Sequence, residues 1–444
     1  MNYPTWTIDV IGSGWVIGLI AIIHVFISHF AVGAGLFLPV TEYFARKHGR
    51  TDVLDFLHHH TRFFLVLTAV AGATTGVGIW FAISLVQPEA TATLIRTFVF
   101  AWGMEWVVFL VEVASLVFYY YGWEKMSPEL HQKIGWVYAA TAFLSLVIIN
   151  GILTFMLTPG TWLVTRSFWG GFFNPTYWPS LIMRAFVALS LAGLWGIYQG
   201  TKLDRDSFLR IWLLRYSSRW LIPSYMFAGF ILIWYLQVVP DPSMAAMTRG
   251  IATAGVGNLS ILTRVAMLIG LFTVTIALLV LFGPYLNPKD FTRAKAVALL
   301  IAGFFVTGAT EWSREVIRKP FAIRGFMYSN GLYLQDVGKK LNTPFIENAR
   351  WARLNPDIGE AMFKMQCMSC HTLHGYRSLA ISLAGRDAES IYNFLVVLQK
   401  GSENPYRDIM PPLLGADADL KALAAYLSKE IAPPPSGGAA SVKP

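Results

Sequence analysis

Eight separate runs of apolar residues, most of them close to 20 residues long, constrain this chain more than any other feature of its sequence. A helix needs about 20 apolar residues to cross a hydrocarbon core of about 30 Å. Only 14% of the 444 residues are charged, whereas soluble domains have about 25%. The sequence therefore predicts an all-α, polytopic membrane bundle. The expected spans are about 11–43, 63–86, 97–121, 135–157, 180–199, 220–239, 259–283 and 294–313.

The charges in the loops predict how this bundle is oriented. Lys and Arg gather in the loops after the first, third, fifth and seventh spans, and the opposite short loops hold only Arg96, Arg166 and Arg249. By the positive-inside rule, the basic loops are cytoplasmic and both termini lie on the outer, periplasmic side of a bacterial-type cytoplasmic (inner) membrane. The net charge of +9 then requires no nucleic acid partner. The N-terminus lacks the basic segment of a cleaved signal peptide, so we expect the first run to be retained as a helix.

Hydrophobicity falls after the eighth span, and the rest of the chain is typical of a soluble unit. We expect a membrane domain at 1–321, a linker at 322–354, a compact unit at 355–431 and a disordered Pro/Gly/Ser-rich tail at 432–444. The compact unit contains the chain's two cysteines in the sequence Cys-Met-Ser-Cys-His. This C-x-x-C-H pattern is the attachment signal for a c-type haem, although C-x-x-C pairs also occur in redox and zinc sites. The motif residues are Cys367, Cys370 and His371.

The residues around this motif resemble a class I monohaem cytochrome c. A short helix with Gly359 and Phe363 precedes the cysteines, Met410 precedes a proline pair, and an amphipathic helix ends the unit. The resemblance implies a small α-helical cytochrome c domain with one covalent haem c, in which His371 is the proximal and Met410 the distal iron ligand. The alternative for Met410 is a loop methionine without a ligand role.

Ionisable side chains inside the spans are costly in a membrane and therefore mark functional positions. His24 lies in the first span, and Glu105 and Glu112 are seven residues apart in the third, which puts both acids on one helix face. A lone histidine can be a satisfied core residue, and an arginine near a span end usually extends to the interface. Neither explanation accounts for two acids together with a histidine. His29 lies about 140° around the helix from His24, so we expect it to be structural. Other charged residues at or near span ends are Arg184, Arg264, Glu311, Arg314, Glu315 and Arg318.

Four stretches of the membrane domain resemble subunit I of the cytochrome bd quinol oxidases. They are IHVFISHFAVGAGLFLPVTEYFA, AVAGATTGVGIWF, FLVEVASLVFYYYGWEK, and EVIRKPFAI, which stands where that family has an E-x-G-R-Q-P-W signature. The resemblance implies that His24 and Glu315 are ligands of two non-covalent haems of b and/or d type. It also implies that Glu112 lies on the proton route to the oxygen site and that Arg318 is the signature arginine. Glu105 lies one residue from a further family glutamate near the d-type haem.

This chain lacks the features through which that family takes up electrons, namely the ligands of the low-spin haem and the long quinol-binding loop. The family's low-spin haem uses a histidine in the fifth span and a methionine in the seventh, where this chain has Arg184 and Ala266, with Met267 one residue away. The quinol-binding loop is reduced to about 240–258, and the family's final helix is replaced by the cytochrome-like unit. The arginines near the outer surface suit haem propionates, because arginine binds carboxylates with two hydrogen bonds, or they are structural. These arginines are Arg184, Arg264, Arg314 and Arg318.

Two functions fit this combination. In the first, the chain is the catalytic subunit of a bd-like terminal oxidase that takes electrons through haem c instead of quinol and reduces O2. In the second, it is a non-enzymatic conduit that carries electrons from an external dehydrogenase to a membrane acceptor; a haem-based sensor is a third, less favoured reading. The retained residues favour the oxidase. The expected partners are the lipid bilayer, a second membrane subunit, an external redox donor (a cytochrome c or a periplasmic dehydrogenase) and O2.

Overall fold

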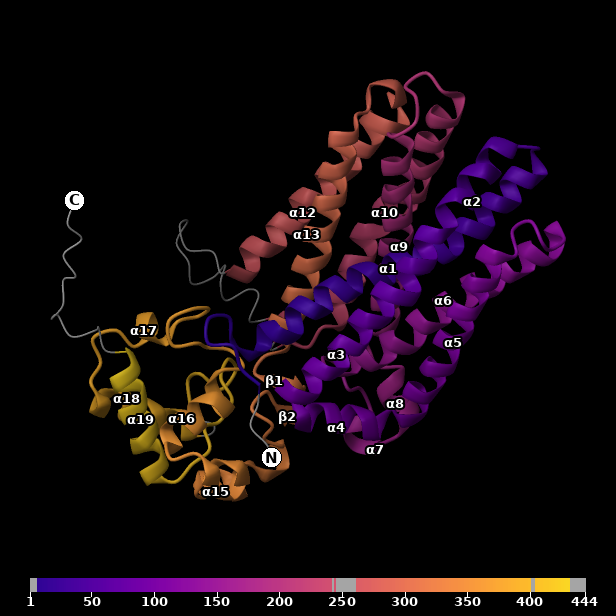
Figure 1. The fold of residues 1–444 in the computed structure, drawn as a ribbon. Coiled ribbons are helices and arrows are strands. Elements are labelled where there is room, and N and C mark those ends of the chain that lie inside the picture. The colour runs from indigo at the N-terminus through magenta and orange to yellow at the C-terminus, as the bar shows by residue number, and fades with distance from the viewer. Residues whose placement is uncertain (1–5, 242, 245–260, 401–403, 432–444) are drawn as a thin grey trace, which may run out of the picture.

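The computed structural model describes residues 6–241, 243–244, 261–400 and 404–431. Within these ranges, eight helical segments are long and apolar enough to cross a membrane, which confirms the predicted multi-pass helical bundle (Figure 1). The segments are α1 (Gly12–Lys47), α2 with the π-helical turn η1 and α3 (Thr51–Val66, Leu67–Gly72 and Ala73–Val86), α5 (Val99–Tyr121), α6 (Pro128–Phe155), α9 (Tyr177–Gly200), α10 (Phe208–Val238), α12 with η2 (Ile261–Val280 and Leu281–Tyr285) and α13 (Arg293–Arg318).

Local sequence signals explain several of the helix boundaries. Ser127 caps α6 by accepting a hydrogen bond from the Leu130 backbone N–H at 3.3 Å, and Pro128 occupies the first helical position. Thr292 caps α13 in the same way through the backbone N–H of Lys295. Both helices therefore begin where a side-chain oxygen satisfies a free backbone donor.

Helix α1 is central to the bundle and packs against α3, α6, α9 and α13. The largest buried cluster joins α1 to α6, α9 and α10, with Phe37, Tyr138, Trp195 and Leu213 among its members. The outward faces of α5, α10 and α12 carry many exposed apolar side chains, as expected for helices that contact lipid. A residue on α1 can therefore reach side chains from most of the other helices.

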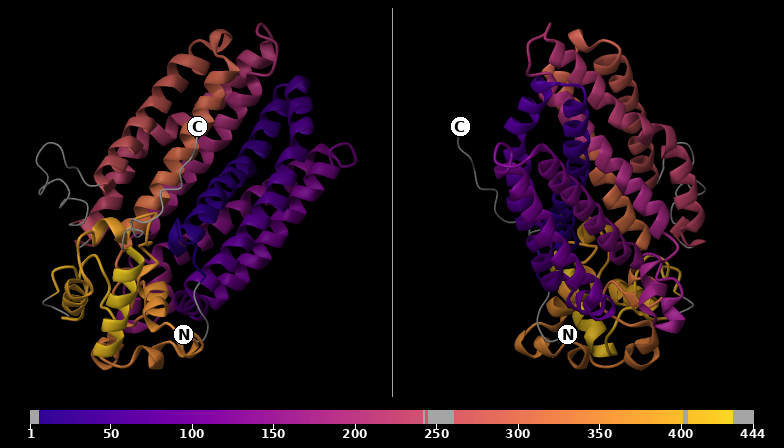
Figure 2. Two further views of the ribbon diagram at one scale, coloured as in Figure 1. Left: turned by 60° about the vertical axis from the view of Figure 1, so that its left-hand side comes forward. Right: turned by 90° about the vertical axis from the view of Figure 1, so that its right-hand side faces the viewer.

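Short elements and the C-terminal unit lie together at one end of the bundle, close to the start of α1 (Figure 2). We call this the docked end and the opposite end the distal end. The short elements at the docked end are α4 (Pro88–Thr97), α7 (Trp162–Thr165), α8 (Phe168–Phe172) and an antiparallel hairpin of β1 (Phe321–Ile323) and β2 (Met327–Tyr328).

The C-terminal unit has its own apolar core. Phe363, Leu395 and Leu423 belong to it, and so do Phe345 and Trp351, so part of the predicted linker packs with this unit. The proposed tail at 432–444 and most of the short loop at 240–258 lie outside the described residues. The elements of the unit are η4 (Leu334–Asp336), α14 (Val337–Lys340), α15 (Phe345–Asn348), η5 (Arg350–Leu354), α16 (Ile358–Met362), η6 (Phe363–Cys367), α17 (Leu379–Ser382), α18 (Ala388–Gln399) and α19 (Asp417–Ile431).

The C-terminal unit contacts the membrane bundle through main-chain hydrogen bonds. The Ser13 backbone N–H and hydroxyl both donate to the Met368 carbonyl, at 3.1 and 2.9 Å. The Tyr376 N–H donates to the Val10 carbonyl at 2.9 Å. The Tyr376 ring also packs edge-on against Trp15, with 5.7 Å between the ring centroids. The C-x-x-C-H loop is therefore seated directly on the first turn of α1.

Candidate functional site

The histidine of the C-x-x-C-H motif has the orientation that an iron ligand needs. The Nδ1 atom of His371 lies 3.1 Å from the Arg377 carbonyl and donates a hydrogen bond to it, which leaves Nε2 available for a metal. Burial lowers the pKa of His371, although the same carbonyl partly opposes the shift. The ring is therefore held in its neutral form, which is the form that binds metals.

The Cys367 thiol does not have the lowered pKa of a reactive thiol in a redox pair. Burial, together with the nearby Cys370, raises the pKa of the Cys367 thiol to about 12, whereas reactive C-x-x-C pairs have a lowered thiol pKa. A structural zinc site would require four ligands, and no cluster of three or more His, Cys, Asp and Glu side chains occurs among the described residues. Cys367 and Met410 both pack at the edge of the same apolar core. The donor set thus fits a covalently attached haem with one imidazole and one thioether.

In the membrane bundle, His24 is also oriented by a hydrogen bond. Its Nδ1 lies 2.9 Å from the Thr75 hydroxyl, which itself donates to the Ala71 carbonyl at 2.7 Å. Gly76 leaves room beside the ring, because a Cβ atom there would lie 3.2 Å from the His24 Cε1 atom. His24 can therefore present Nε2 to an iron, with Thr75 as its supporting residue.

Glu315 lies in the last turn of α13 and is held by two cations. Its carboxylate is paired with Arg318, and its Oε1 atom is 3.3 Å from the Lys319 ammonium. The side chain is 47% exposed, so its oxygens are accessible at the docked end of the bundle. A carboxylate in this position fits the predicted ligand role, with the two cations orienting it.

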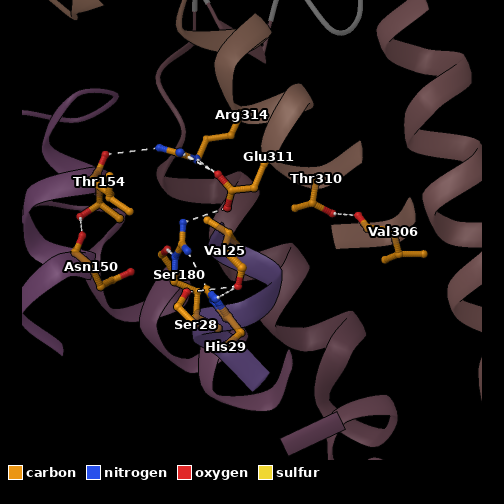
Figure 3. Close-up of polar contacts among 12 residues, drawn as sticks. Val25, Ser28, His29, Asn150, Thr154, Ser180, Val306, Thr310, Glu311 and Arg314 are labelled. Carbon is orange, nitrogen blue, oxygen red and sulfur yellow. Dashed lines mark hydrogen bonds and ion pairs between the residues drawn. The ribbon is translucent and has the colours of Figure 1, made fainter. Parts of the chain in front are cut away.

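A buried ionic cluster joins α1, α9 and α13 (Figure 3). Arg184 donates to Glu311 Oε1 at 3.1 Å and lies 3.4 Å from the His29 Nε2 atom, and Arg314 pairs with Glu311 Oε2 at 2.7 Å. The His29 Nδ1 atom donates to the Val25 carbonyl at 2.8 Å. Arg184 is therefore buried in the bundle and does not extend to the interface as an arginine near a span end usually does. Replacing Glu311 would leave the buried Arg184 without its carboxylate partner, which costs about 3–5 kcal/mol.

The two predicted acids belong to a longer polar seam between α5 and α6. Ser145 donates to Glu105 Oε1 at 3.3 Å, and the His131 Nε2 atom lies 2.9 Å from the Tyr119 carbonyl. Glu112, which is buried, is halfway between Glu105 and Tyr119. The paired residues are seven apart on both helices, so the antiparallel packing of α5 and α6 stacks three polar layers along the bundle. Two layers are joined by a hydrogen bond, Glu105 with Ser145 and Tyr119 with His131. Between them, the spacing puts Glu112 at the level of Tyr138, whose hydroxyl donates to the Ala31 carbonyl at 3.2 Å.

The distal layer contains a buried carboxylate that the sequence analysis missed. Glu42 of α1 has no exposed surface, and it accepts hydrogen bonds from Arg46 at 2.7 Å, His131 Nδ1 at 2.8 Å and the Tyr119 hydroxyl at 2.8 Å. Both nitrogens of His131 face oxygen acceptors, and both can donate only when the ring is protonated. The sequence did contain a signal for this site, because Glu42 is an acidic residue within the apolar run of the first span.

Arg264 and Met267, together with a histidine triplet in α2, lie apart from these groups. Arg264 near the start of α12 has an exposed side chain, and Met267 is exposed as well. In the triplet at residues 58–60, His58 stacks on Trp123, and His59 donates to the Asp55 carbonyl. The structure therefore does not bring Arg264 or these histidines to either His24 or His371.

Comparison with known proteins supports the likeness of the membrane region to one family. A family model described as cytochrome bd terminal oxidase subunit I matches residues 13–208. The fold is similar to that of a bd oxidase from Geobacillus thermodenitrificans, with a TM-score of 0.60 and 14% identity, over 72% of this chain and 91% of that one. No curated protein sequence matches the chain significantly. Residues 13–208 are therefore similar in sequence to cytochrome bd subunit I, and the bundle has a bd oxidase-like fold.

Proposed function

We propose that this protein is the catalytic subunit of a cytochrome bd-like terminal oxidase that takes electrons through a covalent haem c instead of quinol and reduces O2. The observation that carries the proposal is the seating of the C-x-x-C-H loop on the first turn of α1, the helix that contains His24. From Ser13 to His24 is 11 residues, or roughly 16 Å along a helix with a rise of about 1.5 Å per residue. Helix α1 thus contains His24 and, at its first turn, contacts the loop that contains His371.

The side chains that would hold the cofactors are those already described. Cys367 and Cys370 would attach haem c, and His371 and Met410 would be its axial ligands; a thioether ligand raises the reduction potential. His24 and Glu315 would each hold one of two non-covalent haems of b and/or d type. When bound, haem c supplies a one-electron relay and the membrane haems supply the iron at which oxygen is reduced.

The seam between α5 and α6 suits proton delivery to that site. Glu42 and His131 would take up protons at the distal end, where the basic loops lie, so this end is the cytoplasmic one under the positive-inside rule. The carboxyl oxygens of Glu112 and Glu105 would then hold a proton in turn, with Ser145 hydrogen-bonded to the last of them. Each of these groups can both accept and release a proton, which general acid–base transfer requires.

The position of the C-terminal unit at the docked end also supports a proposed electron donor, a membrane partner and a cellular location. A haem c on the docked end would receive electrons outside the cytoplasm, from a cytochrome c or a periplasmic dehydrogenase, in a bacterial-type inner membrane. Arg184 lies where the related family has a haem-ligating histidine, and it is engaged with His29 and Glu311 instead. We therefore infer no low-spin b haem at this position. The exposed apolar faces leave room for a second membrane subunit.

Carbon monoxide distinguishes the oxidase from an electron conduit. An oxidase needs one iron with an open or weakly held position, so the reduced protein is expected to bind the gas and to show a shifted absorption band of a non-covalent haem. Optical difference spectra of the purified, dithionite-reduced protein measure this. The absence of any shift at saturating gas would indicate that every iron is six-coordinate and would support the conduit.

The His24→Ala variant is expected to lose one non-covalent haem and to keep haem c, because the side chain holds iron only in the membrane bundle. A pyridine haemochrome count measures both haem types, with one c-type and two non-covalent haems expected in the unmodified protein. His59→Ala is the matched control, since His59 is exposed and contacts only its own helix in the hydrogen bond to the Asp55 carbonyl. Retention of both non-covalent haems in His24→Ala would remove His24 from the ligand set.

A further inference from the structure

Lys319 occupies an unusual position for a lysine at the end of a membrane span. It follows the last residue of α13, where lysine normally extends its ammonium group to water. Instead, its side chain is only 16% exposed, and its Nζ atom lies 3.3 Å from Glu315 Oε1. Lys319 also stands where the E-x-G-R-Q-P-W signature has a glutamine. This chain therefore places a covered positive charge where the related family has a neutral side chain.

The C-x-x-C-H loop lies near the chain that follows Lys319. The Ser329 N–H donates to the Pro320 carbonyl at 2.9 Å, and Ser329 lines one small cavity together with Ser13 and Ser369. The loop is fixed on α1 by the hydrogen bonds of Ser13 to Met368, and Gly14 permits the approach, since a Cβ atom there would be 2.8 Å from the Ser369 carbonyl oxygen. The Lys319 ammonium group is therefore paired with the Glu315 carboxylate, next to the surface on which the haem-attachment loop is seated.

We propose that Lys319 is a positioning residue that links the haem c site to the Glu315 site: its ammonium holds the Glu315 carboxylate and keeps a fixed positive charge between the two. The proposal rests on the proposed function, because it requires haem at both places. A nearby positive charge favours the reduced, more negative state of an iron centre. Lys319 therefore raises the reduction potential of haem c and of the haem that Glu315 holds.

The Lys319→Gln variant restores the neutral residue of the family signature and tests the charge. At a fixed ambient potential, the ratio of reduced to oxidised haem c is expected to fall about threefold to tenfold, a tenfold change being about 59 mV for one electron. The non-covalent haem held by Glu315 is expected to shift in the same direction. Spectroelectrochemical titration of the purified full-length protein measures both midpoints.

Three further variants complete the test. Lys319→Arg keeps the charge and is expected to keep both midpoints, and Lys319→Met replaces the glutamine variant if that protein does not fold. Lys421→Gln is the control, because Lys421 is exposed and pairs with Asp417 on α19. Unchanged midpoints in a folded neutral variant that contains haem c would overturn the role of Lys319 and leave the proposed function intact. A wild-type protein without covalent haem would overturn the proposed function itself.

Discussion

The Glu112→Gln variant is expected to lower the rate of oxygen consumption by about 100-fold or more, which is the usual contribution of one positioned proton-transfer group. Glu112 is buried in the middle layer of the seam between α5 and α6, and it lies between Glu105 at the docked side and Tyr119 at the distal side. A glutamine has the same shape but cannot carry a proton from one layer to the next. The loss is therefore expected in turnover, with haem content and thermal stability close to those of the unmodified protein.

Oxygen-electrode rates with saturating reduced donor measure this effect, and a haemochrome count shows whether the haems remain. Glu124→Gln is the matched control, because Glu124 is an exposed acid in the loop between the same two helices. Equal rates in Glu112→Gln and Glu124→Gln would exclude the seam as the proton route. A loss of haem in Glu112→Gln would instead assign Glu112 a structural role.

The membrane helices were predictable because their apolar runs are long, but their ends were less so. The second span was expected to begin near residue 63, whereas the helix begins at Thr51. The added turns contain Asp52, Asp55 and three histidines, and no apolar run marks them. Helix α13 likewise continues to Arg318, and its last turns contain two ion pairs between residues three apart, Glu311 with Arg314 and Glu315 with Arg318, which support a helix. Hydropathy detects the apolar middle of a helix and not its charged ends.

The local parts of the site were also easier to predict than those assembled from several helices. The C-x-x-C-H motif lies within five consecutive residues, and the spacing of Glu105 and Glu112 already put both on one face. The carboxylate of Glu42 and the ring of His131 are 89 residues apart in the chain, and Arg184 and Glu311 are 127 apart. Such pairs depend on how helices pack, which a single sequence does not specify. The spacing of seven between Glu105 and Glu112 was the one part of the seam that the sequence indicated, and the matching residues of α6 became apparent only from the packing of the two helices.

Replacing both Cys367 and Cys370 with alanine is expected to abolish the covalent haem and to lower oxidation of an external protein donor by about 100-fold or more. Without the two thioether bonds, haem c is no longer held beside its acceptor, and the high local concentration that tethering provides is lost. The membrane bundle is expected not to depend on these thiols, because Cys367 packs against the separate core of the C-terminal unit. The variant is therefore expected to keep both non-covalent haems and to bind carbon monoxide when reduced chemically.

This variant separates the entry of electrons from the chemistry in the membrane. Stopped-flow oxidation of a reduced cytochrome c measures entry, and the carbon monoxide difference spectrum measures the membrane site. Ser369→Ala is the control, since it changes one of the two residues between the cysteines and keeps both thiols. Full donor oxidation without haem c would mean that electrons enter the bundle directly, and the seating of the C-terminal unit on α1 would then serve assembly alone. Loss of both signals would mean that the unit is required for the bundle to bind its haems. Only loss of donor oxidation with retained gas binding fits an electron inlet that is distinct from the oxygen site.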